Sequence, residues 1–296
     1  MVPVVVCGRP QNLARARELA AALGGEATAA PWRRPLTGGP WIVTVPPTEL
    51  ALAAVRRPTV LDVHTGAFGL KGDARSANRL WLLRRCVARA DATMVCSAPL
   101  AEQVEAWGGR PLVVHEAPPL ETVPPAGEVR AEPRVLVPGY FSHDEPIAEA
   151  VGALRLLPGV VFDLCGSTAR LPEQVLQDAP GEARFHGRVE QEAYVAAIAG
   201  ADVVLALTSQ PESVMRVACE AVWHGRPLVI SDWPINRALF PHAVHVANDA
   251  PAIAAGVNEA LVRHAELRAA AADARAAQLA RWHEQRQALA AALNGG

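Results

Sequence analysis

The sequence predicts an α/β protein with two domains, and three observations support this fold class. Short apolar runs rich in β-branched residues recur along the chain and are typical of buried strands. Helical stretches alternate with these runs, which is the pattern of parallel sheets with right-handed crossovers. A proline-rich stretch at 117–133 divides the series in two. We therefore expect one domain at 1–121, a linker at 122–133 and a second domain at 134–296.

The first domain begins with a strand, a glycine turn and a helix, which is the start of a Rossmann-like unit. The strand is expected at 3–7 and the Ala-rich helix at 13–23. Gly8 lies in the turn between them, either to let the backbone approach a ligand or as an ordinary turn glycine. No G-x-G-x-x-G is present, which disfavours a nicotinamide oxidoreductase. Further strands are expected at 41–45, 59–63, 92–96 and 112–114.

Polar and glycine residues follow the predicted strand at 59–63. The segment 62–66 reads DVHTG and falls at the carboxyl end of that strand. Ligands of open parallel sheets bind at this end. His64 is therefore a candidate ligand contact, or a strand-end histidine satisfied by backbone groups.

The predicted helix at 77–90 is basic and amphipathic, and its four arginines and its apolar residues alternate at helical spacing. This pattern fits either a contact with anionic lipid or an ordinary solvated helix face.

Charge and cysteine content narrow the class of protein. The net charge is −2, so the whole chain carries no signature of nucleic-acid binding. The first 121 residues hold 14 Lys and Arg against 10 Asp and Glu, which suits an anionic partner or an uneven scatter of arginines. The five cysteines form no C-x-x-C pair, and no apolar run reaches membrane-spanning length. With no signal peptide visible, we expect a cytoplasmic protein, peripheral at the membrane if the basic helix binds lipid.

The second domain alternates strands and helices more regularly. Ser142 to Glu145 fits a capping box for a helix at 146–157, and the tail at 252–293 is predicted to be helical. Strands are expected at 134–137, 162–165, 183–186, 203–207, 228–230 and 244–247.

The segment 201–232 contains the strongest candidate site. A strand at 203–207 leads through a polar loop to a helix for which Ser213 is the expected N-cap. A helix N-terminus suits a phosphate, and the carboxylates of Glu212 and Glu220 can accept hydrogen bonds from sugar hydroxyls. The alternative is that Glu212 favours the helix dipole and Glu220 is a surface charge.

This segment resembles the C-terminal domain of bacterial GT4 glycosyltransferases, which are retaining enzymes of the GT-B fold. Glu212 and Glu220 match the E-x7-E motif, 220–229 matches EA-x-x-x-G-x-P-V-V, and 185–189 matches F-x-G-x-V. The resemblance covers about 134–262 well and the first domain more loosely. It implies two Rossmann-like domains that face a cleft, with the C-terminal helix packed back on the first domain.

The resemblance also implies roles for individual residues. Glu220 would hold the ribose of a nucleotide-sugar donor, while Glu212 and His64 would contact the donor sugar. The diphosphate would meet the helix start without a metal or other cofactor. The remaining donor-binding candidates are Gly8, Gly139, Ser142, Ser213, Val214, Met215 and Arg216.

Two departures from the family pattern concern the diphosphate. The Arg and Lys that many members carry are absent from 139–146, and 213–216 reads SVMR in place of Gly-Phe-Gly. Arg216 is either the replacement cation or a partner of Glu212 or Glu220 at i, i+4 spacing.

The sequence thus predicts transfer of a sugar, with retention, to a hydroxyl of a saccharide, a lipid-linked saccharide or a small molecule. Cell-envelope polysaccharide and natural-product glycosylation are both open. The alternatives are an inactive GT-B-like binding subunit, which the missing cations would explain, and a nucleotide-sugar epimerase.

Overall fold

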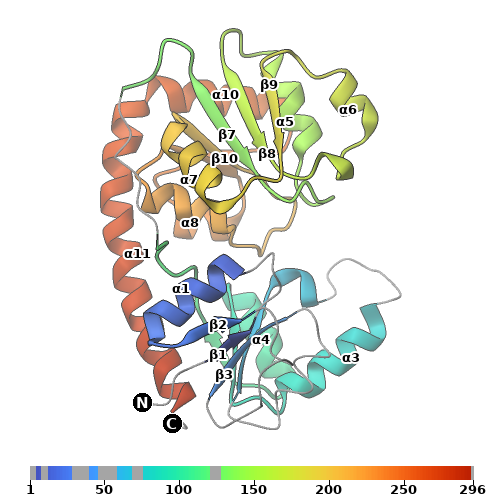
Figure 1. Cartoon of the computed structure of the whole chain (residues 1–296), viewed down its shortest axis with the longest axis vertical. Coiled ribbons are helices and arrows are strands. Elements are labelled where there is room, and N and C mark those ends of the chain that lie inside the picture. Colours follow the sequence, from blue (N-terminus) through green and yellow to red (C-terminus); the bar gives the residue numbers. More distant parts are fainter. Residues whose placement is uncertain are drawn as a thin grey trace. The chain divides into compact units, whose positions relative to one another are not determined.

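The computed structural model describes residues 5–7, 13–28, 40–45, 59–68, 76–120 and 128–294. The chain forms two compact units. Unit 1 comprises Met1–Pro118 and Leu279–Gly296, and unit 2 comprises Pro119–Gln278. Helix α11 (His264–Leu293) contributes to both units. Each unit has its own parallel sheet with helices packed against it (Figure 1), so the predicted α/β class is confirmed.

Among the described residues of unit 1, six parallel strands form a sheet in the order β2-β1-β3-β4-β5-β6. Its strands are β1 (Val5–Cys7), β2 (Glu26–Thr28), β3 (Trp41–Val45), β4 (Thr59–Val63), β5 (Ala92–Val95) and β6 (Pro111–Val113). The helical elements in the described part of unit 1 are α1 (Leu13–Leu23), η3 (Thr65–Phe68), α3 (Ser76–Val87) and α4 (Ala98–Ala106). The sequence pattern did not indicate β2, because this three-residue edge strand is only partly buried and lacks an apolar run.

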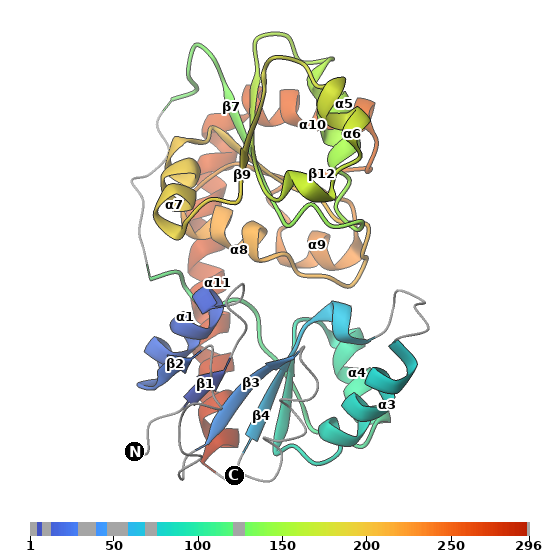
Figure 2. The ribbon, with the colours of Figure 1, turned by 45° about the vertical axis from the view of Figure 1, so that its right-hand side comes forward.

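Alternate residues of the unit 1 strands enter two different cores. Val43, Leu61 and their neighbours pack with α3 and α4 on one face of the sheet. Ile42 and Val60 pack on the other face with residues of α1 and with Trp282 and other residues from the end of α11. Figure 2 shows the ribbons of α1 and of the end of α11 beside this sheet. This alternation is the period-two pattern of strands covered on both faces.

The sheet of unit 2 also has six parallel strands, in the order β12-β11-β10-β7-β8-β9. These are β7 (Arg134–Pro138), β8 (Val161–Cys165), β9 (Ala183–Gly187), β10 (Val203–Ala206), β11 (Leu228–Ser231) and β12 (Val244–Val246). Its helical elements are α5 (Ile147–Leu154), η4 (Thr168–Arg170), α6 (Glu173–Gln177), α7 (Gln191–Gly200), α8 (Arg216–Trp223), α9 (Pro234–Leu239) and α10 (Ala250–Val262). Residues of α5 and α10 share one core, and residues of α7 and α8 share the other.

The prediction that Ser213 caps the helix of the candidate site is wrong. Helix α8 begins at Arg216, and its N-cap is Met215 in an extended conformation with no side-chain cap. Ser213 lies three residues before Arg216. Its backbone N–H donates to the Gln210 carbonyl at 3.3 Å in a turn. Ser readily stabilises such turns as well as helix starts, so its identity alone did not distinguish the two.

The predicted capping box at 142–145 forms only one of its two contacts, from the Ser142 N–H to the Glu145 side chain, and it does not cap a helix. Helix α5 begins at Ile147 after Pro146, and no side chain caps it. Ser142 and Glu145 instead close a turn, in which the Glu145 N–H donates to the Ser142 carbonyl at 2.9 Å. Proline disfavours helical backbone at the residue before it, so Glu145 remains outside the helix.

Candidate functional site

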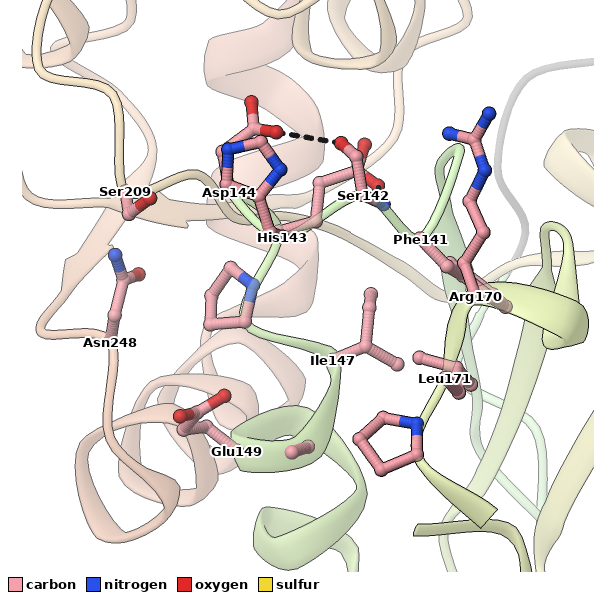
Figure 3. A pocket seen from close by; sticks show the side chains of 14 residues that line it. Phe141, Ser142, His143, Asp144, Ile147, Glu149, Arg170, Leu171, Ser209 and Asn248 are labelled. Atoms are coloured by element: carbon pink, nitrogen blue, oxygen red, sulfur yellow. Dashed lines mark hydrogen bonds between the residues drawn. The ribbon is translucent and has the colours of Figure 1, made fainter. Parts of the chain in front are cut away.

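The loops that follow several unit 2 strands meet at the carboxyl edge of the sheet, as expected for parallel strands. They enclose a pocket of about 670 Å³ (Figure 3). Three carboxylates and one arginine line it, so its charge is mainly negative. Its lining residues are Phe141, Ser142, His143, Asp144, Glu145, Pro146, Ile147, Ala148, Glu149, Arg170, Leu171, Pro172, Ser209 and Asn248. Carboxylate, amide and hydroxyl groups of this kind hydrogen-bond hydroxylated ligands.

The loop after β7 is organised around the carboxylate of Glu145. This carboxylate accepts from the backbone N–H of Ser142 at 2.9 Å and of Tyr140 at 3.3 Å. Burial raises the pKa of Glu145, and these backbone donors act against that rise. A Cβ on Gly139 would lie 2.9 Å from the carboxylate oxygens. The loop amides are therefore held by a side chain of the same loop.

The hydroxyl of Ser142 donates to Asp144 at 2.7 Å, and Figure 3 shows this contact at the pocket rim. The Ser209 N–H in turn donates to the Asp144 carbonyl at 2.7 Å. The first contact lies within the loop after β7, and the second connects this loop with the loop after β10. The predicted donor-binding residues Gly139 and Ser142 thus belong to one hydrogen-bonded loop system with Ser209.

The Glu220 side chain on α8 is buried and is held by two donors. Glu220 as a whole residue is 5 % exposed. The Tyr194 hydroxyl of α7 donates to Oε2 at 2.6 Å, and Arg216 Nε donates to Oε1 at 2.7 Å. Burial and the adjacent carboxylate raise the pKa of Tyr194 well above its ordinary value, so the hydroxyl remains a donor. Of the two interpretations of Arg216, the structure shows the i, i+4 ion pair with Glu220.

Sequence reasoning missed Tyr194. It lies 26 residues before Glu220 on a different helix, and no spacing rule connects the two positions. Glu212 is half-buried in the loop that precedes α8, not on the helix itself. The two motif glutamates therefore do not share a helix face. Ser213, Val214 and Met215 lie in that same loop, and Val214 and Met215 pack against the core of unit 2.

Unit 1 carries a second polar cluster, at the carboxyl end of β4. Arg15 of α1 donates to both carboxylate oxygens of Asp62, from Nε at 3.0 Å and from NH2 at 3.1 Å. The Thr44 hydroxyl donates to Oδ2 of Asp62 at 3.2 Å. Although burial by itself raises the pKa of Asp62, the Arg15 guanidinium and His64 hold it well below its usual range. His64 lies just after β4, with Nε2 3.7 Å from Asp62 Oδ2.

The same arginine connects the cluster to the segment after β6. Arg15 NH1 lies 2.7 Å from Glu116 Oε1. The neighbouring His115 ring contacts the amide of Gln285 on α11 at 3.1 Å. Burial and the nearby Arg281 lower the pKa of His115 to about 4, so this ring is neutral at physiological pH. Gly8, the remaining predicted donor-binding residue, lies outside the described residues.

Within the ranges that the structure describes, no group of three or more His, Cys, Asp or Glu residues is placed to hold a metal ion. Of the helices in those ranges, none is both long enough and apolar enough to cross a lipid bilayer.

Two Rossmann-like units, each with its own parallel sheet, are the architecture of the GT-B fold, and solved structures confirm it. HepE from Anabaena, in complex with UDP and glucose, superposes with a TM-score of 0.75 at 13 % identity, over 100 % of both chains. Sucrose-phosphate synthase from Thermosynechococcus elongatus gives 0.70 at 16 % identity, over 97 % of both chains. A TarM variant from S. aureus gives 0.65 at 12 % identity, over 90 % of this chain and 58 % of that one.

The chain belongs to the glycosyl transferase-like family, whose model matches residues 145–293. The matched segment contains α8 with Glu220, and also Tyr194 and Glu212. No curated protein sequence matches the chain.

Proposed function

We propose that the protein is a retaining glycosyltransferase of the GT4 type that uses a nucleoside diphosphate sugar. Its acceptor is the hydroxyl of a saccharide, a lipid-linked saccharide or a small molecule, in cell-envelope polysaccharide or natural-product glycosylation. The observation that carries this proposal is the buried Glu220 carboxylate, which Tyr194 and Arg216 hold at the site of the family motif. The similar HepE structure contains UDP and glucose, and the TarM variant contains UDP and alpha-GlcNAc-glycerol, which supports a nucleotide-sugar donor.

In this proposal Glu220 accepts hydrogen bonds from the ribose hydroxyls. Glu212 and His64 contact the hydroxyls of the donor sugar. The diphosphate lies against the backbone N–H groups that end the loop at 213–216, with Gly139 and Ser142 on a neighbouring loop and Gly8 beside the donor. Arg216 forms an ion pair with Glu220. It can therefore contact the diphosphate only if its guanidinium binds Glu220 and the diphosphate at the same time. No metal or other cofactor takes part.

The transfer step exchanges one bond at the anomeric carbon for another. The bond from this carbon to the diphosphate oxygen breaks, and a bond to the acceptor oxygen forms on the same face. The leaving phosphate takes the proton of the acceptor hydroxyl, so no side chain of the enzyme needs to accept that proton. Backbone N–H groups aimed at the diphosphate stabilise the charge that develops on it.

The first experiment tests donor binding and turnover together. We expect one base series in a panel of nucleoside diphosphates and their sugars to raise the melting temperature. A ligand at 100 times its Kd adds about 2.7 kcal/mol to the free energy of unfolding. The selected donor is then incubated with and without acceptors, and released nucleoside diphosphate is measured, with the anomeric configuration of the product read by NMR.

Each contrary result identifies a different alternative. Stabilisation without transfer to any acceptor would favour a binding subunit. The structural argument for this alternative is that the Glu145 side chain already binds the backbone N–H groups of its own loop. A new sugar nucleotide formed from the donor alone would favour an epimerase. An inverted product would retain the transferase and reject retention.

We also propose that the exposed face of α3 contacts anionic lipid. Trp81 is 58 % exposed, and the Arg85 guanidinium lies 4.6 Å from the centroid of its ring. Arg79 and Arg84 are exposed on the same helix, and Arg89 is exposed in the turn that follows it. Each basic side chain near an anionic surface contributes about 1 kcal/mol, and a tryptophan ring suits the interface itself.

Replacing Arg85 and Arg89 by glutamine is expected to weaken binding to phosphatidylglycerol-containing vesicles by about 30-fold, since about 2 kcal/mol is lost. Co-sedimentation with vesicles measures this. The control exchanges Arg17 and Arg286, two exposed arginines of the same unit, for glutamine. An equal loss in both variants, or no binding by the unaltered protein, would reject a dedicated membrane face.

A further inference from the structure

We propose that Asp62 is a positioning residue, anchored by Arg15, that fixes the ring of His64 so that Nε2 faces the protein and Nδ1 faces the donor sugar. This inference deepens the proposed function and rests on it for the identity of the ligand. It adds roles for Asp62 and Arg15 to the proposed contact of His64 with the donor sugar.

The first step is the geometry of the Asp62 and His64 pair. The two residues are separated by one position at the end of β4, and Nε2 of His64 lies 3.7 Å from Oδ2 of Asp62. Nε2 is buried and makes no hydrogen bond within the described part of the chain, although the side chain as a whole is 40 % exposed. One ring nitrogen thus faces a carboxylate, while part of the side chain is exposed to solvent.

The second step is the fixed position of the carboxylate. Asp62 is 3 % exposed and Arg15 is 6 % exposed. Both oxygens of Asp62 accept from Arg15, and Oδ2 accepts from Thr44 as well. Arg15 is itself held by Glu116. Three donors from two elements therefore determine where Oδ2 lies, independently of His64.

The third step is the effect of that carboxylate on the imidazole. An ionised carboxylate cannot donate, so the ring nitrogen that faces it is favoured as the protonated one. In the neutral ring this leaves Nδ1 as an acceptor. A sugar hydroxyl is a suitable donor to it, and a fixed acceptor restricts the orientation of the sugar.

A matched pair of variants separates positioning from general support of the cluster. Asp62→Asn removes the charge that faces His64 but keeps the shape of the side chain. Glu116→Gln removes the other carboxylate that pairs with Arg15 and leaves the Asp62 and His64 contact in place. Both variants alter the surroundings of Arg15, but only the first alters those of His64.

The direct readout is the ¹⁵N NMR spectrum of the full-length protein labelled at histidine, with His64 assigned by the loss of its signal in His64→Gln. We expect the neutral ring to be protonated at Nε2 in the unaltered protein and in Glu116→Gln, and to become a mixture of tautomers in Asp62→Asn. A ring protonated at Nδ1 in the unaltered protein would overturn the proposal, and this test needs no variant that perturbs folding.

The second readout is a double-mutant cycle in the transfer assay. Asp62→Asn should lower kcat about tenfold, within the range of coupling between contacting residues, and Glu116→Gln should leave it close to normal. In a His64→Ala background, Asp62→Asn should have no further effect. An equal loss in that background would show that Asp62 only supports the fold. Absence of transfer by the unaltered protein, with the Nε2 tautomer present, would instead reject the proposed function and retain the positioning.

Discussion

Replacing Glu220 by glutamine is expected to weaken nucleoside diphosphate binding by about 100-fold, because the ribose loses an ionised acceptor worth about 1.5–3 kcal/mol. The amide keeps the size of the side chain and one oxygen that can accept from Tyr194. Fold stability should therefore change much less than affinity. Isothermal titration calorimetry measures the affinity for the diphosphate that the thermal-shift panel selects.

Glu192→Gln is the control for this experiment, because Glu192 is an exposed glutamate on α7 and undergoes the same chemical change. Its affinity should equal that of the unaltered protein. Unchanged affinity in Glu220→Gln would contradict the assignment of Glu220 to the ribose. The Arg216→Met variant distinguishes two roles of Arg216. If Arg216 acts through Glu220, the variant should bind the nucleoside and the nucleoside diphosphate more weakly by the same factor. If Arg216 contacts the phosphates directly, only the affinity for the nucleoside diphosphate should fall.

Replacing Arg15 by methionine is expected to lower the free energy of unfolding of unit 1 by about 3–5 kcal/mol, as for other broken buried ion pairs. The reason is that Asp62 and Glu116 both lose their common cation. Urea unfolding at neutral pH measures the loss. Arg17→Met, on the exposed face of the same helix, should change stability by no more than about 0.5 kcal/mol. Equal effects of the two variants would show that the buried ion pairs do not stabilise the unit.

The effect of Arg15 should depend on pH in a defined direction. Because the folded-state pKa of Asp62 lies below its unfolded-state value of about 4, the stabilisation is complete above that pH. It is lost progressively as the pH falls below about 4 and Asp62 becomes protonated in the unfolded chain. The difference between Arg15→Met and the unaltered protein should therefore shrink in acid.

The strands were the most predictable part of this fold. Strands of a parallel sheet that is covered on both faces are buried on both sides, so runs such as 203–207 and 228–230 are apolar throughout. Their composition alone therefore predicts them as strands. Helix starts were less predictable. Ser213 and Ser142 carry the same side chain whether they cap a helix or close a turn, and the choice depended on local geometry and on Pro146.

The candidate sites were predictable only in part, for a related reason. His64 was predicted from its position at the end of a strand, and Glu220 was predicted from a sequence motif. Their partners come from elsewhere in the chain: Arg15 is 47 residues from Asp62, and Tyr194 is 26 residues from Glu220. Such contacts arise when separate elements pack on one sheet, and single-sequence periodicity carries no information about them.

The loops after β7 and β8 interlock, which bears on any attempt to graft the missing Arg and Lys into this chain. A Cβ on Gly166 would lie 2.5 Å from the Phe141 ring and 2.7 Å from the Gly139 carbonyl, and Phe141 has a φ of 54°. Exchanging Glu145 alone would release the amides that it holds. A cation-bearing loop would therefore have to be transplanted together with both strand ends. In related sequences, substitutions at these positions should occur together.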